Sequence, residues 1–266
     1  MMKEEQLLEK RLIELSKTSY HRDIVMFSDF LNLNERNILH TLPKDLLYAD
    51  YVTFGGYDLA ERQMAAFIPD ALSLRTEQNH EYREENFAYP IDFPFKVMSI
   101  KPLNSKYAEN LTHRDYLGAI LNLGIDRSKL GDILVENDRT VIFVHNSLAQ
   151  FLCDELTRVR HTNVILKELS GEEFSYTPKI EEITGTVASI RLDSLLSLAF
   201  SSSRSKLTGL IEGGKVFVNG RLMTTNSYQV KDNDVISARG MGKFKYEGSG
   251  AKTKKNRLFV TIHKYI

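Results

Sequence analysis

The amino-acid sequence predicts an α+β protein that is divided into three small domains. Apolar residues over 93–168 alternate between strand-like and helix-like spacing in the order β-α-β-β-α-β, which is typical of a ferredoxin-like domain. Residues 191–247 have the pattern of two short helices followed by short strands. With 266 residues, the chain is long enough to bury such cores without disulfide bonds.

The N-terminal segment is expected to form a small α+β unit. One helical pattern surrounds Leu12, a second joins Ile24, Phe27 and Leu31, and two strand-like runs follow. Composition shifts then place the domain boundaries. The predicted parts are an N-terminal α+β domain (1–75), a ferredoxin-like, RNA-recognition-like domain (76–168), a linker (169–188), a C-terminal domain (189–248) and a basic tail (249–266).

Charge is distributed unevenly along a chain whose net charge is zero. Residues 1–190 contain 21 Lys and Arg against 30 Asp and Glu, whereas residues 191–266 contain 14 against 5. The resulting balance of +9 in the C-terminal segment favours a polyanionic partner through counterion release. A solvated basic tail would give the same count, so the motifs within 191–247 decide between the two interpretations.

The composition excludes several classes of protein. Cys153 is the single cysteine, which rules out an internal disulfide and a four-cysteine zinc site. The seven histidines lack metal-ligand spacing, and we expect neither a metal nor another cofactor. The charged first twenty residues do not resemble a signal peptide, and no apolar run approaches the ~18 residues of a membrane span. We therefore expect a cytoplasmic protein without a membrane partner.

The C-terminal segment carries specific motif spacing. Apolar residues predict a helix that begins near Leu192 and a second helix over Arg204–Glu212. Ser201-Ser202-Ser203 supplies an N-cap for the second helix, and Gly213-Gly214 ends it. Asn219-Gly220 is the strongest short signal for a β-hairpin.

These stretches resemble the RNA-binding S4 (S-four) domain, named from the fourth protein of the small ribosomal subunit. The matching motifs are Arg191-Leu192-Asp193-x-x-Leu196, Ser203-Arg204-Ser205-Lys206, Leu210-Ile211-x-x-Gly214-x-Val216-x-Val218-Asn219 and Asp234-x-Ile236-x-x-Arg239-Gly240. The resemblance implies that structured RNA binds to basic residues on the two-helix face and the adjoining turn. Carried over by position, the candidate RNA-binding residues are Arg191, Ser203, Arg204, Ser205, Lys206, Lys215, Asn219, Arg239, Lys243 and Lys245.

Some of these residues have alternative interpretations. Arg204 and Lys206 lie at a predicted helix N-terminus, where backbone N–H groups also favour phosphate. Arg191 could instead pair with Asp193 or cap a helix. In Lys243-Phe244-Lys245-Tyr246, either the aromatic rings stack on bases while the lysines contact phosphates, or alternate residues form the buried face of an edge strand.

The middle domain shares the topology of RNA-recognition modules but lacks their aromatic platform. At the position of the platform strand the sequence reads Thr140-Val141-Ile142-Phe143-Val144-His145, with one aromatic residue and no preceding basic residue and glycine. The sequence therefore does not decide whether this sheet contacts RNA or has a protein-facing or structural role.

Further motifs extend the resemblance over most of the chain. They are Thr112-His113-Arg114-Asp115-Tyr116-Leu117-Gly118-Ala119, Leu123-Gly124-Ile125-x-Arg127-x-Lys129-Leu130-Gly131-Asp132-Ile133, and Phe54-Gly55-Gly56-Tyr57 with Arg62. With the S4 domain, they are similar to the YlmH family of bacterial proteins. That resemblance implies a protein without catalytic activity that binds the large ribosomal subunit and acts in the rescue of stalled nascent chains. The implied partners are ribosomal RNA, tRNA and, through an association with cell-division gene clusters, a division-site protein.

Three basic residues of these motifs are additional candidates for contact with RNA or the ribosome. Arg114 lies in the first turn of a predicted helix. Arg127 and Lys129 lie in a helix-to-strand connection and are expected to be exposed. The alternative is that they pair with Asp126 and Asp132.

Two other classes of function compete with a non-catalytic RNA-binding protein. Arg191-Leu192-Asp193 resembles the catalytic triplet of pseudouridine synthases, which would make the chain an RNA-modifying enzyme. In those enzymes the aspartate lies in a large domain after the RNA-binding module, whereas here the triplet opens the module. The other alternative is a cell-division adaptor whose RNA binding is secondary.

Overall fold

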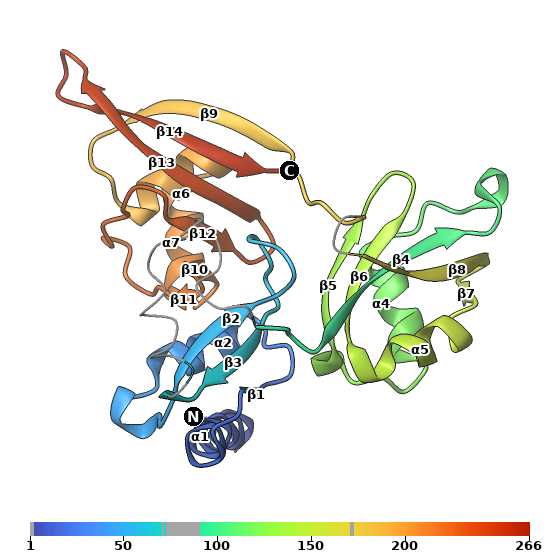
Figure 1. Cartoon of the computed structure of the whole chain (residues 1–266). Coiled ribbons are helices and arrows are strands. Elements are labelled where there is room, and N and C mark those ends of the chain that lie inside the picture. The colour runs from blue at the N-terminus through green and yellow to red at the C-terminus, as the bar shows by residue number, and fades with distance from the viewer. Residues whose placement is uncertain (1–2, 71, 73–90, 171–172) are drawn as a thin grey trace. The chain divides into compact units, whose positions relative to one another are not determined.

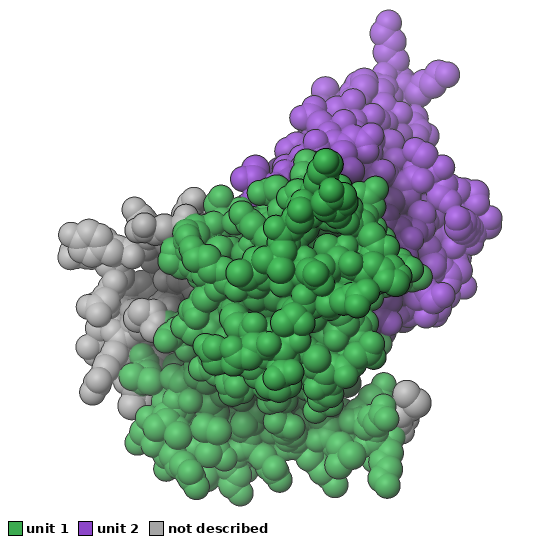
Figure 2. All heavy atoms as spheres, turned by 90° about the vertical axis from the view of Figure 1, so that its right-hand side faces the viewer, with its two compact units in different colours: residues 1–175 green, residues 176–266 purple. Residues whose placement is uncertain are grey.

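The computed structural model describes residues 3–70, 72, 91–170 and 173–266, with the side chain of Arg204 left out, and divides the chain into two compact units (Figures 1 and 2). Unit 1 comprises residues 1–175 and unit 2 residues 176–266. The fold is α+β, as predicted: the described residues form six α-helices and three antiparallel sheets. None of the described helices combines the length and apolarity needed to cross a bilayer.

The N-terminal part of unit 1 packs two helices on a sheet of strand order β1-β3-β2. The predicted first helix is present, and its Leu12 is fully buried. The helix predicted from Ile24, Phe27 and Leu31 is wrong, because the chain turns at Asp23 (φ 52°) and then pairs with β3. The elements are α1 (Lys3–Arg22), β1 (Met26–Phe27), α2 (Leu33–Thr41), β2 (Asp50–Phe54) and β3 (Met64–Ile68).

The middle part of unit 1 contains a five-stranded sheet of order β5-β6-β4-β8-β7. Its elements follow the predicted order β-α-β-β-α-β, with the two-residue β7 added at one edge. Helices α4 and α5 pack on one face, where Tyr116, Ile120 and Leu152 are buried. The elements are β4 (Phe95–Pro102), α4 (His113–Leu121), β5 (Leu130–Val135), β6 (Thr140–His145), α5 (Asn146–Glu155), β7 (Arg158–Val159) and β8 (Thr162–Leu169).

The N-terminal part covers the other face of this sheet. Phe30 and Met64 from the N-terminal part share a buried cluster with Val141 and Phe143 of β6. The Tyr57 ring stacks on the Phe143 ring at a centroid distance of 5.6 Å. Over β6 and the adjoining part of β4 both faces of the middle sheet are therefore buried, and the two parts of unit 1 share a core, whereas Ile165 of β8 stays 56% exposed on that second face. The predicted boundary at residues 75–76 lies outside the described residues.

Unit 2 packs α6 and α7 on one face of a six-stranded sheet of order β11-β10-β12-β13-β14-β9 (Figure 1). The predicted hairpin turn is present: Asn219 and Gly220 both have positive φ (49° and 78°), as a type I′ turn requires. The elements are β9 (Ile180–Val187), α6 (Leu192–Phe200), α7 (Arg204–Glu212), β10 (Val216–Val218), β11 (Arg221–Leu222), β12 (Val235–Ala238), β13 (Gly242–Lys252) and β14 (Leu258–Tyr265).

The linker and the basic tail expected from the sequence are strands of unit 2. Strand β9, within the expected linker over 169–188, pairs along its whole length with β14, within the expected tail over 249–266. Val260 and Ile262 of β14 are buried, so an alternating apolar pattern holds the segment in the sheet despite its charge. Unit 2 thus includes residues on both sides of the predicted C-terminal domain.

Candidate nucleic-acid interface

The S4 motif begins at the N-terminus of helix α6, and buried apolar side chains fix this helix on the sheet. Leu192, Leu195 and Leu196 are fully buried, which orients the preceding Arg191 at the N-cap position. The Arg191 guanidinium lies 3.3 Å from the Asp193 carboxylate, and its side chain remains 39% exposed. Of the alternatives considered for Arg191, pairing with Asp193 is present; the residue also occupies the N-cap position, but its side chain makes no capping hydrogen bond.

The first turn of α7 presents polar and cationic residues to solvent. Ser203 occupies the predicted N-cap position, and its hydroxyl lies 3.3 Å from that of Ser205. Lys206 is exposed. Leu207, in contrast, is fully buried against the sheet and fixes which face of the helix points outward. The helix begins at Arg204, whose side chain is not described.

Lys215 and Arg239 are brought together although they are far apart in the sequence. The Arg239 backbone N–H donates to the Lys215 carbonyl at 2.9 Å, and both residues are exposed. The Arg239 guanidinium lies 5.6 Å from the centre of the Phe217 ring, a cation–π contact that limits its freedom. These two cations can therefore face one anionic group.

Asn219 has a structural role that the motif comparison did not predict. Its side-chain amide donates to Asp234 at 2.7 Å, and its oxygen accepts the Val235 N–H at 2.9 Å. These bonds fasten the hairpin turn to the loop before β12. Both ends of the Asn219 side chain are therefore engaged within the fold.

The interpretation of Phe244 and Tyr246 as base-stacking residues is wrong. Both are fully buried, because β13 lies between β12 and β14 and alternate residues face the core. Lys243 and Lys245 occupy the other face of β13, and Lys245 pairs with Glu247 at 3.0 Å. The buried-face alternative is correct, although this part of β13 is not an edge strand.

Arg127 and Lys129 are not the free surface cations that the sequence predicts. Arg127 donates to the carbonyls of Leu130 (2.8 Å) and Gly131 (3.0 Å). Burial, together with the neighbouring Arg62, lowers the pKa of Arg127 to about 10. Lys129 pairs with Asp29 at 2.6 Å rather than with Asp126 or Asp132. Arg127 thus fixes its own turn, and Lys129 links the two parts of unit 1.

Arg62 and Asp132, which lie in the sequence motifs but have no structural role predicted there, join the two parts of unit 1. Asp132 accepts hydrogen bonds from the Tyr57 hydroxyl (2.8 Å) and from the N–H groups of Glu61 (2.7 Å) and Arg62 (3.1 Å).

The Arg62 guanidinium donates to the carbonyls of Phe30, Arg127 and Leu130 at 2.8–3.0 Å. A side chain at Gly56 (φ 99°) would lie 2.2 Å from the Phe143 ring. The Gly55-Gly56-Tyr57 and Arg62 motif therefore indicates the packing between the two parts of unit 1 and not a ligand-binding or catalytic site.

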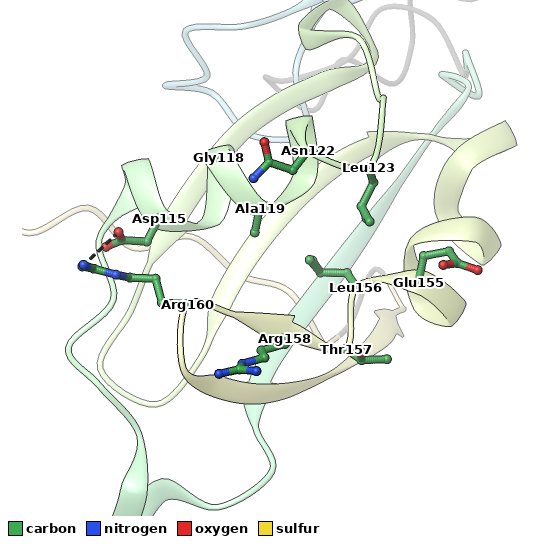
Figure 3. A pocket seen from close by; sticks show the side chains of 10 residues that line it. All are labelled: Asp115, Gly118, Ala119, Asn122, Leu123, Glu155, Leu156, Thr157, Arg158 and Arg160. Atoms are coloured by element: carbon green, nitrogen blue, oxygen red, sulfur yellow. Dashed lines mark ion pairs between the residues drawn. The ribbon is translucent and has the colours of Figure 1, made fainter.

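The motif around His113 begins helix α4. Asp115 accepts hydrogen bonds from the Thr112 N–H (2.8 Å) and hydroxyl (2.7 Å), which lower the pKa of Asp115. It also pairs with Arg160 at 3.3 Å, beside a shallow hollow of about 510 Å³ between α4 and the segment around β7 (Figure 3). Arg114 is exposed and remains available to a partner.

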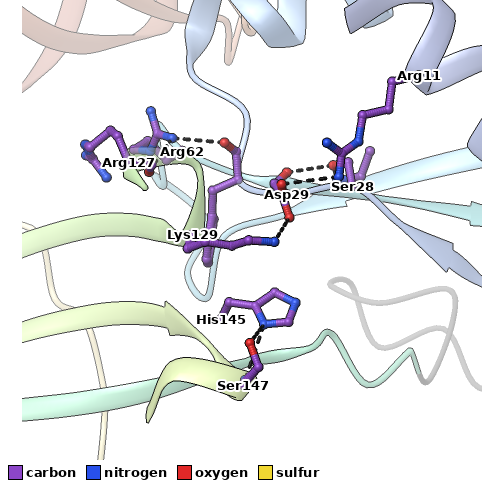
Figure 4. Close-up of polar contacts among 10 residues, drawn as sticks. Arg11, Ser28, Asp29, Arg62, Arg127, Lys129, His145 and Ser147 are labelled. Carbon is purple, nitrogen blue, oxygen red and sulfur yellow. Dashed lines mark hydrogen bonds and ion pairs between the residues drawn. The ribbon is translucent and has the colours of Figure 1, made fainter. Parts of the chain in front are cut away.

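A second polar cluster surrounds Asp29 (Figure 4). Asp29 lies 2.6 Å from Lys129 and 3.4 Å from Arg11. Beyond Lys129, the Nδ1 atom of His145 accepts the Ser147 N–H at 3.3 Å and so caps helix α5. Partial burial, and then the charge of Lys129, lower the pKa of His145, whereas Asp29 raises it to a smaller extent.

This arrangement predicts a pH dependence of stability. Because the folded-state pKa of His145 lies below the unfolded value of ~6.5, the unfolded chain binds more protons, and stability falls as the pH drops below that value. Protonation also removes the acceptor that caps α5 and places a cation at a helix N-terminus. Urea unfolding at pH 7.5 and 5.5 should show a smaller loss for His145→Asn, which caps without titrating. An equal loss in both proteins would contradict the assignment.

Within the described ranges, no group of three or more His, Cys, Asp or Glu side chains could hold a metal ion. In unit 2, basic residues lie instead on α7 and around the β10 hairpin. Such an arrangement can hold phosphate groups.

Comparison with known proteins agrees with this description. Residues 90–173 match a family model described as "Putative RNA-binding domain in YlmH", and residues 190–236 match the S4 domain. Over 98% of its length, the chain is 28% identical to the ribosome-associated protein quality control protein P2 of Bacillus subtilis, of which it covers 96%. Over 111 residues, 38% of this chain and 54% of the relative, it is 30% identical to the small ribosomal subunit protein uS4 of Chromohalobacter salexigens. A solved structure titled cell division protein ylmH from Streptococcus pneumoniae aligns with a TM-score of 0.47 at 24% identity, and covers 65% of this chain and 95% of that chain.

Proposed function

The chain belongs to the YlmH family, and on this basis we propose that it is a non-catalytic RNA-binding protein of ribosome-associated quality control. Its unit 2 would hold structured RNA of the large ribosomal subunit, with or without bound tRNA. The observation that carries the proposal is the S4 domain, with its exposed cations, in a segment whose charge balance is +9. Phosphate contacts of this kind supply most of the affinity of RNA-binding surfaces.

We propose a smaller set of RNA-contacting residues than the motifs alone suggest. The first turn of α7, with Arg204 and Lys206, forms the centre of the surface, and Lys215 and Arg239 extend it. Arg191 contributes through the exposed part of its side chain. Ser203 and Ser205 offer hydroxyls beside them, whereas Asn219 and Lys245 are occupied within the fold.

The burial of Asp193 supports a non-catalytic role. In a pseudouridine synthase the corresponding aspartate must reach the target base. Here Asp193 is 7% exposed, lies in the first turn of α6 and pairs with Arg191. A carboxylate held in this way cannot approach a substrate unless α6 leaves the sheet.

For unit 1 we propose a positioning role. Its middle part has the strand order of a ferredoxin-like domain, but the N-terminal part covers β6 and part of β4, the central strands of the face that binds RNA in recognition modules. Any RNA contact by unit 1 would therefore use exposed residues outside this covered area, such as Arg114. The excess of acidic residues before Ile190 disfavours a broad RNA contact.

Co-sedimentation with ribosomal subunits tests the proposal. The full chain should sediment with the large subunit at low salt and be released at high salt. Residues 1–175 alone should remain in the supernatant. A protein that ends at residue 175 keeps the shared core of unit 1 intact and lacks β9 together with its partner β14. Binding of neither protein to any subunit would reject the ribosomal assignment.

A further inference from the structure

Strands β13 and β14 continue beyond the body of unit 2 as an arm. The ladder between β12 and β13 ends at the pair Val235–Lys245, whereas β13 continues to Lys252. Tyr246 is still buried and bonded to the loop before β12, so the free part of the strand is the four residues from Ser249 to Lys252, roughly 13 Å long. Figure 1 shows the turn between β13 and β14 projecting from the rest of its unit.

The arm has a defined conformation up to its tip. Strand β9 still pairs with β14 at Val187–Leu258, so the arm is braced on one side. The Arg257 side chain donates to the Thr186 hydroxyl at 3.1 Å and also to the Thr186 carbonyl. The turn closes through the Thr253 hydroxyl, which accepts the Arg257 N–H at 3.1 Å. One basic residue, Arg257, therefore stabilises the arm.

The other basic residues at the tip form no ion pair with an acidic residue in the described part of the chain. Lys252, Lys254 and Lys255 are exposed, and residues 248–266 contain no Asp or Glu. The acidic residues of the neighbouring strands lie away from the tip, in the body of the sheet, and are already paired. These pairs are Glu247 with Lys245 and His263, Glu181 with Lys264, and Glu182 with His263.

We infer that this tip, with Lys252, Lys254 and Lys255, is a second RNA-binding surface that contacts the phosphates of double-helical RNA. Three adjacent lysines without carboxylates favour a polyanion. The exposed residues behind the tip, Ser249, Gly250 and Ala251, are small and uncharged, so they do not obstruct the approach of the lysines to the wide, shallow minor groove of an A-form helix. The inference rests on the proposed function and adds a binding surface separate from α7.

Replacement of the three lysines by alanine in the full chain tests the inference. The probes are a 20-base-pair RNA duplex and purified large ribosomal subunits, and affinity is measured at several salt concentrations. We expect the triple variant to bind the duplex at least about tenfold more weakly, with a salt slope lower by about 0.7–0.9 for each phosphate that the lysines no longer neutralise. The matched control is Lys3→Ala/Lys10→Ala/Lys44→Ala, which removes three exposed charges from unit 1 and should bind like the original protein.

The outcomes separate this inference from the proposed function. If the original protein binds and the triple variant keeps its affinity and salt slope, the arm is not an RNA-binding surface. An equal loss in the control would assign the effect to net charge and also overturn the inference. A variant that loses affinity for the large subunit, but not for the duplex or for protein-free ribosomal RNA, would assign the arm to a ribosomal protein instead. Failure of the original protein to bind either probe would reject the proposed function as well.

Discussion

Truncation of Phe143 to alanine should lower the free energy of unfolding of unit 1 by about 3–5 kcal/mol and leave the RNA affinity of the folded protein unchanged. Phe143 is fully buried between the middle sheet and the N-terminal part, where its ring packs against Tyr57, Phe95 and Phe174. Its removal leaves a cavity that the surrounding rings can fill only in part. Urea unfolding gives the loss of stability, and binding below the unfolding transition gives the affinity.

The control for this variant is Phe143→Leu, which retains most of the buried volume and should cost less. The comparison distinguishes a core residue from a base-stacking residue at the platform position. A loss of RNA affinity in folded Phe143→Ala, with little loss of stability, would show that this sheet face opens to RNA. That result would contradict the buried junction.

The double substitution Arg204→Ala/Lys206→Ala should weaken binding to the large subunit by one to two orders of magnitude at moderate salt. Lys206 is exposed in the first turn of α7, where it and Arg204 would add charge to the outward N–H groups of the helix. With two phosphates no longer neutralised, the salt slope should fall by roughly 1.4–1.8. Affinity measured against salt concentration gives both quantities.

A matched control for charge is Lys3→Ala/Arg22→Ala at the two ends of α1, which should leave both affinity and slope unchanged. Stability should be nearly the same in all three proteins, because Lys206 and both control residues are exposed. If the α7 variant binds like the original protein, α7 does not form the centre of the RNA surface.

The parts of the fold that local patterns determine could be predicted from the sequence. Helices α6 and α7 have apolar residues at helical spacing, and the Asn219-Gly220 turn requires two positive φ angles that these residue types adopt readily. Strand β14 was not predicted, because its basic residues are typical of a solvated tail although its apolar residues alternate as in a strand. Its partner β9 lies more than 70 residues earlier, and no local signal indicates that pairing. Phe27 shows the reverse error, since helical spacing there coincides with a short strand.

The sequence predicts which types of residue form the candidate site, but not which of their side chains are free to bind a ligand. Lys206 and Arg239 are exposed, as the S4 motif implies. Lys129 carries the expected charge, but its partner Asp29 lies 100 residues away and is brought near only by the packing of unit 1. Asn219 matches the motif, yet its hydrogen bonds are internal. Long-range contacts thus decide which cations remain free for a ligand.

The central claim is that RNA is held by unit 2 while the sheet face of unit 1 stays closed. The most direct test is ultraviolet crosslinking of the full chain to large ribosomal subunits, followed by mass spectrometry of the crosslinked peptides. We expect crosslinks over residues 203–215 and 252–255, and none on β4 or β6. Crosslinks on Phe95 or Phe143, with α7 unmodified, would contradict the claim.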